Sequence, residues 1–298
     1  MICRETPLTF DCQGETLIGI LHEAPAVSRR GVLIVVGGPQ YRAGSHRQFV
    51  LLARTLASAG LPTLRFDYRG MGDSTGPFRG FEHINDDIAA AIDAFRAHLP
   101  YVEEVVIWGL CDAASAALFY AHRDPRIRGL ILVNPWARTA SGEAKTYLKH
   151  YYTARLLERD FWRKLASGRF DVRESLRSLK DMLRRAALGR ATRLGGGDHS
   201  NTIEDCDGRP LPERMAEGMR RFAGPVLLIM SGNDFTAREF DEATGKSTVW
   251  RDLLASSRIE RRDLDEADHT FSRRAWLDQV GAWSIDWLQN LDDLPLGQ

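Results

Sequence analysis

The sequence has no excess charge of either sign and no long hydrophobic run. Its 298 residues include 40 basic and 40 acidic side chains, which leave a formal net charge of zero. We therefore expect neither a nucleic-acid partner nor binding to a charged membrane surface. No apolar stretch approaches the ~20 residues that a membrane-spanning helix needs. Residues 1–6 also lack the basic flank and apolar run of a signal peptide.

Cysteine is scarce as well: the four residues are Cys3, Cys12, Cys111 and Cys206. Their spacing fits neither a disulfide framework nor a zinc site. We therefore expect free thiols and a reducing, cytoplasmic location. The glycines at residues 70–72 form an incomplete phosphate-binding pattern, so neither a metal nor an organic cofactor is expected.

Short apolar runs and helical patterns alternate along most of the chain. Two β-type runs at 8–10 and 16–20 predict an opening hairpin. The run at 31–36 is apolar throughout, which is typical of a strand buried on both faces of a parallel sheet. Further strands are expected at 61–66, 105–108, 129–133, 226–230 and 258–264. Apolar residues at helical spacing cover residues 45–59, 82–98, 112–122, 238–256 and 273–290. The alternation predicts an α/β fold with a mostly parallel sheet flanked by helices.

The alternation breaks from residue 137 to residue 222. This stretch is mostly helical in pattern and contains 19 basic and 12 acidic residues, a net charge of +7. We predict a helical lid at 137–222, inserted into a core made of residues 1–136 and 223–298. A basic lid suits an anionic substrate carrier, although charges on surface helices are commonly only solvated.

Residues 109–113, with the sequence GLCDA, lie between an expected strand and an expected helix. A nucleophile with small residues two positions before and after it is the pattern of a nucleophile elbow, in which strand and helix approach closely. A helix N-terminus and a histidine both lower the pKa of a thiol. Cys111 is therefore the candidate nucleophile. The alternative is a buried structural cysteine at a strand–helix junction.

His269 is the candidate base, because it lies after the last expected strand and completes the chain order nucleophile, acid, histidine. The candidate acid is Asp234, which follows the strand at 226–230 and could orient the imidazole. Asp268 and Asp112 compete for this role. Each is adjacent to its triad partner in sequence, and side chains at neighbouring positions rarely meet well.

A tetrahedral intermediate also needs backbone N–H donors. In an elbow of this kind one donor is the residue after the nucleophile, here Asp112, and the second comes from a loop near the start of the sheet. Residues 37–40, with the sequence GGPQ, form that loop. Pro39 has no N–H, so Gln40 or Gly38 must donate, and we favour Gln40.

These segments together resemble the α/β-hydrolase superfamily over nearly the whole chain. The loop at 37–40, the segment DYRGMGDS at 67–74, the elbow, Asp234 and the segment DHTF at 268–271 stand in the family's order. More narrowly, the chain is similar to the type 1 hydrolases associated with exosortase A systems. The matching segments are GGPQYR at 37–42, SHRQ at 45–48 and GLCDAA at 109–114. That subgroup is encoded beside acyl-carrier and acyl-ligase functions, which implies acyl thioesters as substrates. The cysteine departs from the superfamily's usual serine. Dienelactone hydrolases share it, with different surrounding residues and chain layout.

We therefore predict an enzyme that hydrolyses acyl thioesters or transfers the acyl group through an acyl-cysteine intermediate. Coenzyme A or an acidic acyl carrier protein would carry the acyl group. Whether the lid excludes water decides between hydrolysis and transfer. A carboxylic-ester or lactone hydrolase is the alternative enzyme. A catalytically silent homologue that binds a ligand or partner is the alternative of another class, and the presence of Cys111, His269 and Asp234 argues against it.

Overall fold

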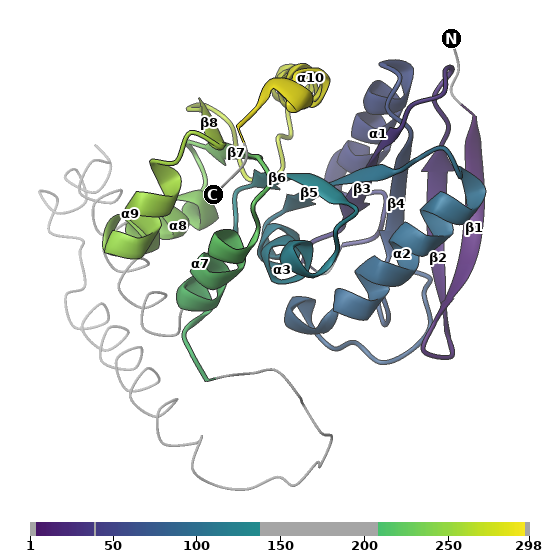
Figure 1. Ribbon diagram of the computed structural model, residues 1–298, viewed down its shortest axis with the longest axis horizontal. Coiled ribbons are helices and arrows are strands. Elements are labelled where there is room, and N and C mark those ends of the chain that lie inside the picture. Colours follow the sequence, from purple (N-terminus) through teal and green to yellow (C-terminus); the bar gives the residue numbers. More distant parts are fainter. Residues whose placement is uncertain (1–3, 39, 138–207, 296–298) are drawn as a thin grey trace, which may run out of the picture. The chain divides into compact units, whose positions relative to one another are not determined.

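Eight strands form a single sheet in the computed structural model, which describes residues 4–38, 40–137 and 208–295 (Figure 1). The strands are β1 (Glu5–Cys12), β2 (Glu15–His22), β3 (Arg30–Val35), β4 (Thr63–Asp67), β5 (Glu104–Leu110), β6 (Ile127–Val133), β7 (Val226–Ser231) and β8 (Ile259–Leu264). Their order across the sheet is β1-β2-β4-β3-β5-β6-β7-β8. Strand β2 pairs antiparallel with β1 and β4, and every other neighbouring pair is parallel. The predicted opening hairpin and mostly parallel sheet are confirmed.

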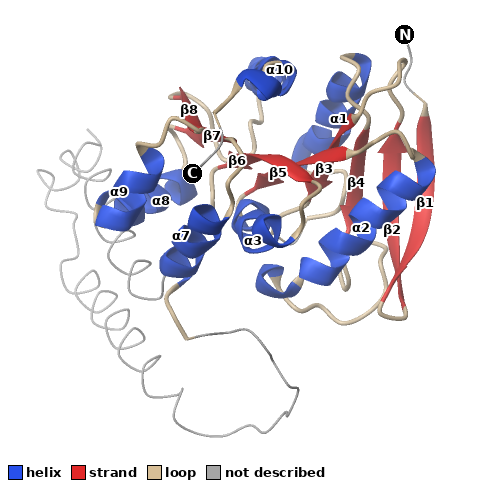
Figure 2. Cartoon of the chain, in the orientation of Figure 1, coloured by secondary structure: helices blue, strands red, loops and turns tan. Residues whose placement is uncertain are grey.

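Helices connect the parallel strands, as Figure 2 shows. The α-helices of the described residues are α1 (Gln48–Ser58), α2 (Asn85–His98), α3 (Asp112–Tyr120), α7 (Leu211–Arg221), α8 (Phe235–Gly245), α9 (Thr248–Leu254) and α10 (Arg274–Gln289). Short 3-10 helices are η1 (Ser45–Arg47), η2 (Phe81–His83), η3 (Ala121–Arg123) and η5 (Leu291–Asp293). None of the helices in this described part of the chain is long and apolar enough to cross a membrane.

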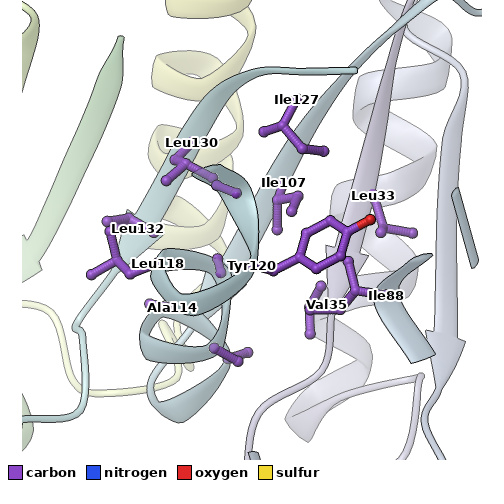
Figure 3. Close-up of a cluster of buried hydrophobic side chains, with 14 of the residues drawn as sticks. Leu33, Val35, Ile88, Ile107, Ala114, Leu118, Tyr120, Ile127, Leu130 and Leu132 are labelled. Carbon is purple, nitrogen blue, oxygen red and sulfur yellow. The ribbon is translucent and has the colours of Figure 1, made fainter. Parts of the chain in front are cut away.

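The side chains of the central strands alternate between two apolar layers, because successive residues of a strand point to opposite faces. On β5, Val105 and Ile107 join the layer packed under α2, α3 and α7, whereas Val106 and Trp108 join the layer under α1 and α10. Figure 3 shows part of the first layer, in which Ile107 lies among side chains of the neighbouring strands and helices. Burial on both faces explains why the central strands are apolar throughout.

The segment 238–256, predicted to be one helix, is two helices in the structure. Helix α8 ends at Gly245, and α9 begins after Ser247, whose hydroxyl accepts a hydrogen bond from the backbone N–H of Trp250 at 3.4 Å. Glycine favours helix termination and serine is a preferred N-cap. This local chemistry outweighs the continuous apolar periodicity.

Most of the predicted lid, residues 138–207, lies outside the described residues. Its last part is described, because α7 falls within 208–222. This helix packs closely on α3: a Cβ on Gly218 would lie 2.2 Å from the carbonyl oxygen of Leu118. The position of Gly218 therefore needs a residue without a side chain.

A buried ion pair ties the segment after β4 to α2. The side chains of Arg69 and Asp87 are 2% and 1% exposed. The Arg69 guanidinium donates from Nε to Oδ1 of Asp87 at 3.0 Å and from Nη2 to Oδ2 at 2.7 Å, and the backbone N–H of Arg69 adds a third bond at 2.8 Å. Such a pair holds its two segments in one geometry, because neither charge can return to water without disrupting the core.

We expect Asp87→Ala to lower the free energy of unfolding by about 3–5 kcal/mol, because it removes the buried carboxylate that accepts three hydrogen bonds from Arg69. Urea denaturation followed by circular dichroism measures this change. The matched control is Glu103→Ala, which breaks the exposed pair between Arg29 and Glu103 and should change stability little. Equal losses in the two variants would contradict the prediction.

Candidate active site

Cys111 occupies the sharp turn between β5 and α3 in a conformation that L-residues rarely adopt. Its backbone angles are φ 64° and ψ −127°. Backbone hydrogen bonds hold this geometry: the Cys111 N–H donates to the carbonyl of Val133 at 2.9 Å, and the Cys111 carbonyl accepts from Trp136 N–H at 3.1 Å. A Cβ on Gly109 would lie 2.8 Å from the backbone of Ala113. The expected requirement for a small residue two positions before the cysteine is therefore met by close contact of strand and helix.

Asp234 and His269 meet at the carboxyl end of β7. The Nδ1 of His269 donates to Oδ2 of Asp234 at 2.7 Å, since a carboxylate can only accept. Asp234 is the N-cap of α8, and its two oxygens accept backbone N–H bonds from Thr236 at 3.1 Å and Ala237 at 3.2 Å. The capping bonds hold the carboxylate facing the imidazole, which leaves Nε2 as the ring nitrogen available for proton transfer.

The carboxylate of Asp268, which competes with Asp234 in sequence, is used within its own loop. Its Oδ1 accepts the backbone N–H groups of Thr270 at 3.2 Å and Ser272 at 3.0 Å, and its Oδ2 accepts the Ser272 hydroxyl. Asp268 therefore shapes the turn that carries His269, and Asp234 is the carboxylate that contacts the ring.

The loop after β3 reaches the elbow through Gly37 and Gly38. A Cβ on Gly37 would lie 2.2 Å from the carbonyl oxygen of Leu110, so only glycine allows this approach. The backbone N–H of Gly38 points to α3, where it donates to Oδ1 of Asp112 at 2.6 Å. The N–H of Gln40 instead donates to the Gly38 carbonyl at 2.7 Å and closes a tight turn. The N–H groups of both candidate donors are therefore bound within the protein, that of Gly38 by the side chain of Asp112 and that of Gln40 by its own turn.

Gln40 contributes through its side chain. Its Oε1 accepts from the backbone N–H of Ser45 at 3.4 Å and from Nε2 of the buried Gln48 at 3.3 Å. These bonds connect the GGPQ and SHRQ segments of the sequence. The structure therefore gives Gln40 a part in holding this loop.

Opposing effects act on the pKa of the Asp112 carboxyl. Burial raises this pKa, whereas hydrogen bonds from the backbone N–H groups of Gly38, Ala113 and Asp112 itself act to lower it. The charge of His269 also acts to lower it.

Asn134 connects the ends of β6 and β7 to the loop of His269. The sequence analysis did not identify this residue. It is fully buried with φ 43°, and its side chain bridges the end of β6 to the end of β7. Its Oδ1 accepts the backbone N–H of Ser231 at 2.8 Å, and its Nδ2 donates to the Ser231 hydroxyl at 2.9 Å and to the carbonyl of His269 at 3.3 Å. The available signal was a polar residue directly after an apolar strand. Asn134 therefore supports the backbone of His269.

The segment 67–74 is joined to the same loop by a buried carboxylate. Asp67 is fully buried and accepts hydrogen bonds from the backbone N–H of Arg42 at 2.6 Å, from the Arg42 guanidinium, and from the N–H of Asp73 at 3.2 Å. Burial raises its pKa against these bonds.

Within residues 4–38, 40–137 and 208–295, no group of three His, Cys, Asp or Glu side chains is arranged to hold a metal ion.

Solved structures with the same fold include several esterases. An esterase of Pyrococcus furiosus is 14% identical with a TM-score of 0.63, and the match covers 97% of this chain and 93% of that one. Dienelactone hydrolase of Anabaena variabilis is 14% identical with a TM-score of 0.61, covering 98% and 99%. The Butyrivibrio proteoclasticus protein Est1E, solved with ferulic acid bound, is 16% identical with a TM-score of 0.58, covering 96% and 99%. No curated protein matches the chain.

The family model described as serine aminopeptidase, S33, matches residues 28–243, which is more than half of the sequence. The match includes Cys111 and Asp234 and continues through the segment between β6 and β7. This match shows that the chain belongs to the serine aminopeptidase S33 family. The match and the eight-stranded sheet with its helical layers identify the chain as an enzyme of the α/β-hydrolase type.

Proposed function

We propose that this protein transfers acyl groups through Cys111, with His269 as the base and Asp234 as the acid that orients it. The observation that carries the proposal is the strained backbone of Cys111 at the N-terminus of α3. Strain of this kind persists where the surrounding structure imposes it, and it clusters at active sites. The family model is named for a serine, and in this chain the thiol stands at the elbow.

The proposed reaction has two steps. His269 takes the thiol proton, and the thiolate attacks the substrate carbonyl. The backbone N–H groups of Asp112 and Gly38 stabilise the resulting oxyanion. The tetrahedral intermediate then expels the leaving group, which receives its proton from His269, and an acyl-Cys111 remains. In the second step water or another acceptor attacks this thioester while His269 removes its proton. The second tetrahedral intermediate then expels the Cys111 thiolate, which regains its proton from His269.

The contacts of Asp234 support its part in this cycle. Its hydrogen bond to Nδ1 fixes the imidazole tautomer and stabilises the imidazolium that forms when the thiol is deprotonated. The backbone N–H groups of Thr236 and Ala237 bind the same carboxylate and hold it toward the ring.

Acyl thioesters are the proposed substrates because of the leaving groups. From the tetrahedral intermediate of an oxygen ester, the Cys111 thiolate leaves more readily than the alkoxide, so the intermediate mostly reverts. With a thioester the two leaving groups are nearly matched, and acylation proceeds. The basic segment 137–222, proposed as a lid on a core of 1–136 and 223–298, would attract the phosphates of coenzyme A or an acidic carrier protein.

A carboxylic-ester or lactone hydrolase is the second candidate. It is favoured by the structural similarity to a dienelactone hydrolase and to esterases, which at this identity reflects a shared fold. The two candidates differ in which substrate acylates Cys111 faster.

The first test compares kcat/KM for an acyl-coenzyme A and its oxygen-ester analogue. We expect the thioester to be favoured by at least about tenfold, with a mass increase of one acyl group on Cys111 in intact-mass spectrometry. Cys111→Ala should abolish both signals. Equal or faster turnover of the oxygen ester would favour the second candidate.

Iodoacetamide provides an independent comparison of two thiols in one protein. Burial raises the pKa of Cys12 to about 11, so that thiol should react slowly at pH 7.5. Faster labelling of Cys111, with parallel loss of activity, is expected. Labelling of Cys111 without loss of activity would contradict its role as nucleophile.

Asp234→Asn should lower kcat by roughly 10²- to 10⁴-fold with a small change in KM, because the amide no longer selects the tautomer that accepts the thiol proton. The matched control is Asp268→Asn, which changes the neighbouring carboxylate in the His269 loop and should lower kcat by only a few-fold. A larger loss in Asp268→Asn than in Asp234→Asn would reverse the assignment.

Asn134→Ala should lower kcat by about tenfold at unchanged KM and lower the free energy of unfolding by about 1–3 kcal/mol, since it leaves the buried N–H of Ser231 without its acceptor. Asn134→Asp keeps that acceptor and tolerates the positive φ, but it loses the donor to His269. It should therefore recover stability more than kcat. Equal recovery of both quantities would show that Asn134 acts only on folding.

A further inference from the structure

The side chain of Asp112 accepts a backbone N–H that the proposed mechanism assigns to the oxyanion. Its Oδ1 lies 2.6 Å from the backbone N of Gly38. The N–H groups of Ala113 and of Asp112 itself also act on this carboxyl. A Cβ on Gly37 would lie 2.5 Å from the same Oδ1, so the carboxyl is pressed against the loop. Backbone donors from both sides of the elbow thus converge on an acceptor that belongs to the enzyme.

We propose that the Asp112 carboxylate is a gate on the oxyanion pocket: it holds the Gly38 N–H in the free enzyme and must yield it before a substrate carbonyl can bind beside Cys111. The inference rests on the proposed function, because it assumes that Cys111 attacks a carbonyl. It adds a role for the side chain of Asp112, whereas the proposed mechanism uses only its backbone N–H.

The gate follows from a competition between two acceptors. A carboxylate accepts N–H hydrogen bonds more strongly than a neutral carbonyl oxygen does, so the enzyme's own group disfavours the first encounter with substrate. The oxyanion that forms after attack is itself charged, so it competes with the Asp112 carboxylate for the Gly38 N–H more strongly than the carbonyl does. The gate therefore weakens ground-state binding more than it weakens binding of the tetrahedral state.

The charge on Asp112 makes the gate depend on pH. The groups of the described residues that interact electrostatically with it include His269, from the loop after β8, and Tyr68, after β4. The thiol of Cys111 precedes it in the chain. Burial raises the carboxyl's pKa, against the N–H bonds and the charge of His269. As the pH falls through this raised pKa, the carboxyl becomes neutral and a weaker acceptor. The gate should therefore be strongest above that pKa and weaken below it.

The test uses hexanal, which adds reversibly to a thiol and forms a hemithioacetal whose oxygen mimics the oxyanion. Its Kd is obtained from the protection of Cys111 against iodoacetamide, a reaction that needs no oxyanion pocket. At pH 8 we expect Asp112→Ala to bind hexanal about tenfold more tightly than the native enzyme. The isosteric Asp112→Asn should show a smaller gain, because its amide oxygen is a neutral acceptor. In the native enzyme alone, the affinity should rise as the pH is lowered.

Glu103→Gln is the control, since it removes an exposed carboxylate that pairs with Arg29 outside the proposed site, and it should leave the Kd unchanged. Thermal denaturation checks that each variant is folded. If Asp112→Ala does not fold, the pH profile of Asp112→Asn decides: a flat profile supports the gate, and a profile parallel to the native one overturns it.

Unchanged or weaker hexanal binding in Asp112→Ala would overturn the gate, because the carboxylate would then be neutral to the pocket or would contribute to it. Failure of iodoacetamide to alkylate Cys111 in every protein, native included, would overturn the proposed function and the gate with it. Normal alkylation with equal hexanal affinity in all variants would overturn the gate alone.

Discussion

The strained backbone at Cys111 is the constraint on which the rest of the site depends. A residue with a Cβ adopts φ 64° and ψ −127° only where its surroundings impose this conformation. Here the surroundings are the parallel strands, because the N–H of Cys111 is bound by the last residue of β6 and its carbonyl by Trp136. The turn places the thiol beyond the carboxyl edge of the sheet and starts α3 directly after it. The backbone N–H groups at the start of α3 are consequently unpaired within the helix and face the same point.

The remaining groups reach this point because parallel strands end at one edge. Strand β7 is followed by Asp234, β8 by the loop of His269, and β3 by Gly37 and Gly38. The order of the strands separates β3 from β7 by only β5 and β6, so the elbow on β5 lies between the glycine loop and the histidine. Asn134 completes the arrangement by joining the ends of β6 and β7 to the backbone of His269. Residues from four loops are thereby held by a rigid sheet.

Much of this arrangement could be predicted from the sequence, because it depends on features that local patterns record. Apolar runs reveal strands buried on both faces, and the small residues around Cys111 reveal the close approach of strand and helix. Asp234 could be preferred over Asp268 because neighbouring side chains rarely meet. The break between α8 and α9 was missed since periodicity alone does not register a cap such as Ser247. Asn134 was missed because its two partners, Ser231 and His269, are 97 and 135 residues away in the chain.

The choice between Gln40 and Gly38 depends on which acceptors take their N–H groups, and local sequence patterns do not record these acceptors. The N–H of Gln40 donates within a turn, and the N–H of Gly38 donates to Asp112.

The hydrogen bond from Gly38 to Asp112 has a physical reason. Donors that converge on a partly buried point are unfavourable when they are left without an acceptor, because each has lost its hydrogen bonds to water. Filling that point with the carboxylate of Asp112 stabilises the free enzyme, and the burial of that charge limits how much is gained. Under the proposed mechanism, a site that binds a transient negative charge must hold some acceptor during the rest of its cycle, and the residue after Cys111 can supply one. Stability of the free enzyme and reactivity toward a carbonyl would then oppose each other at Asp112.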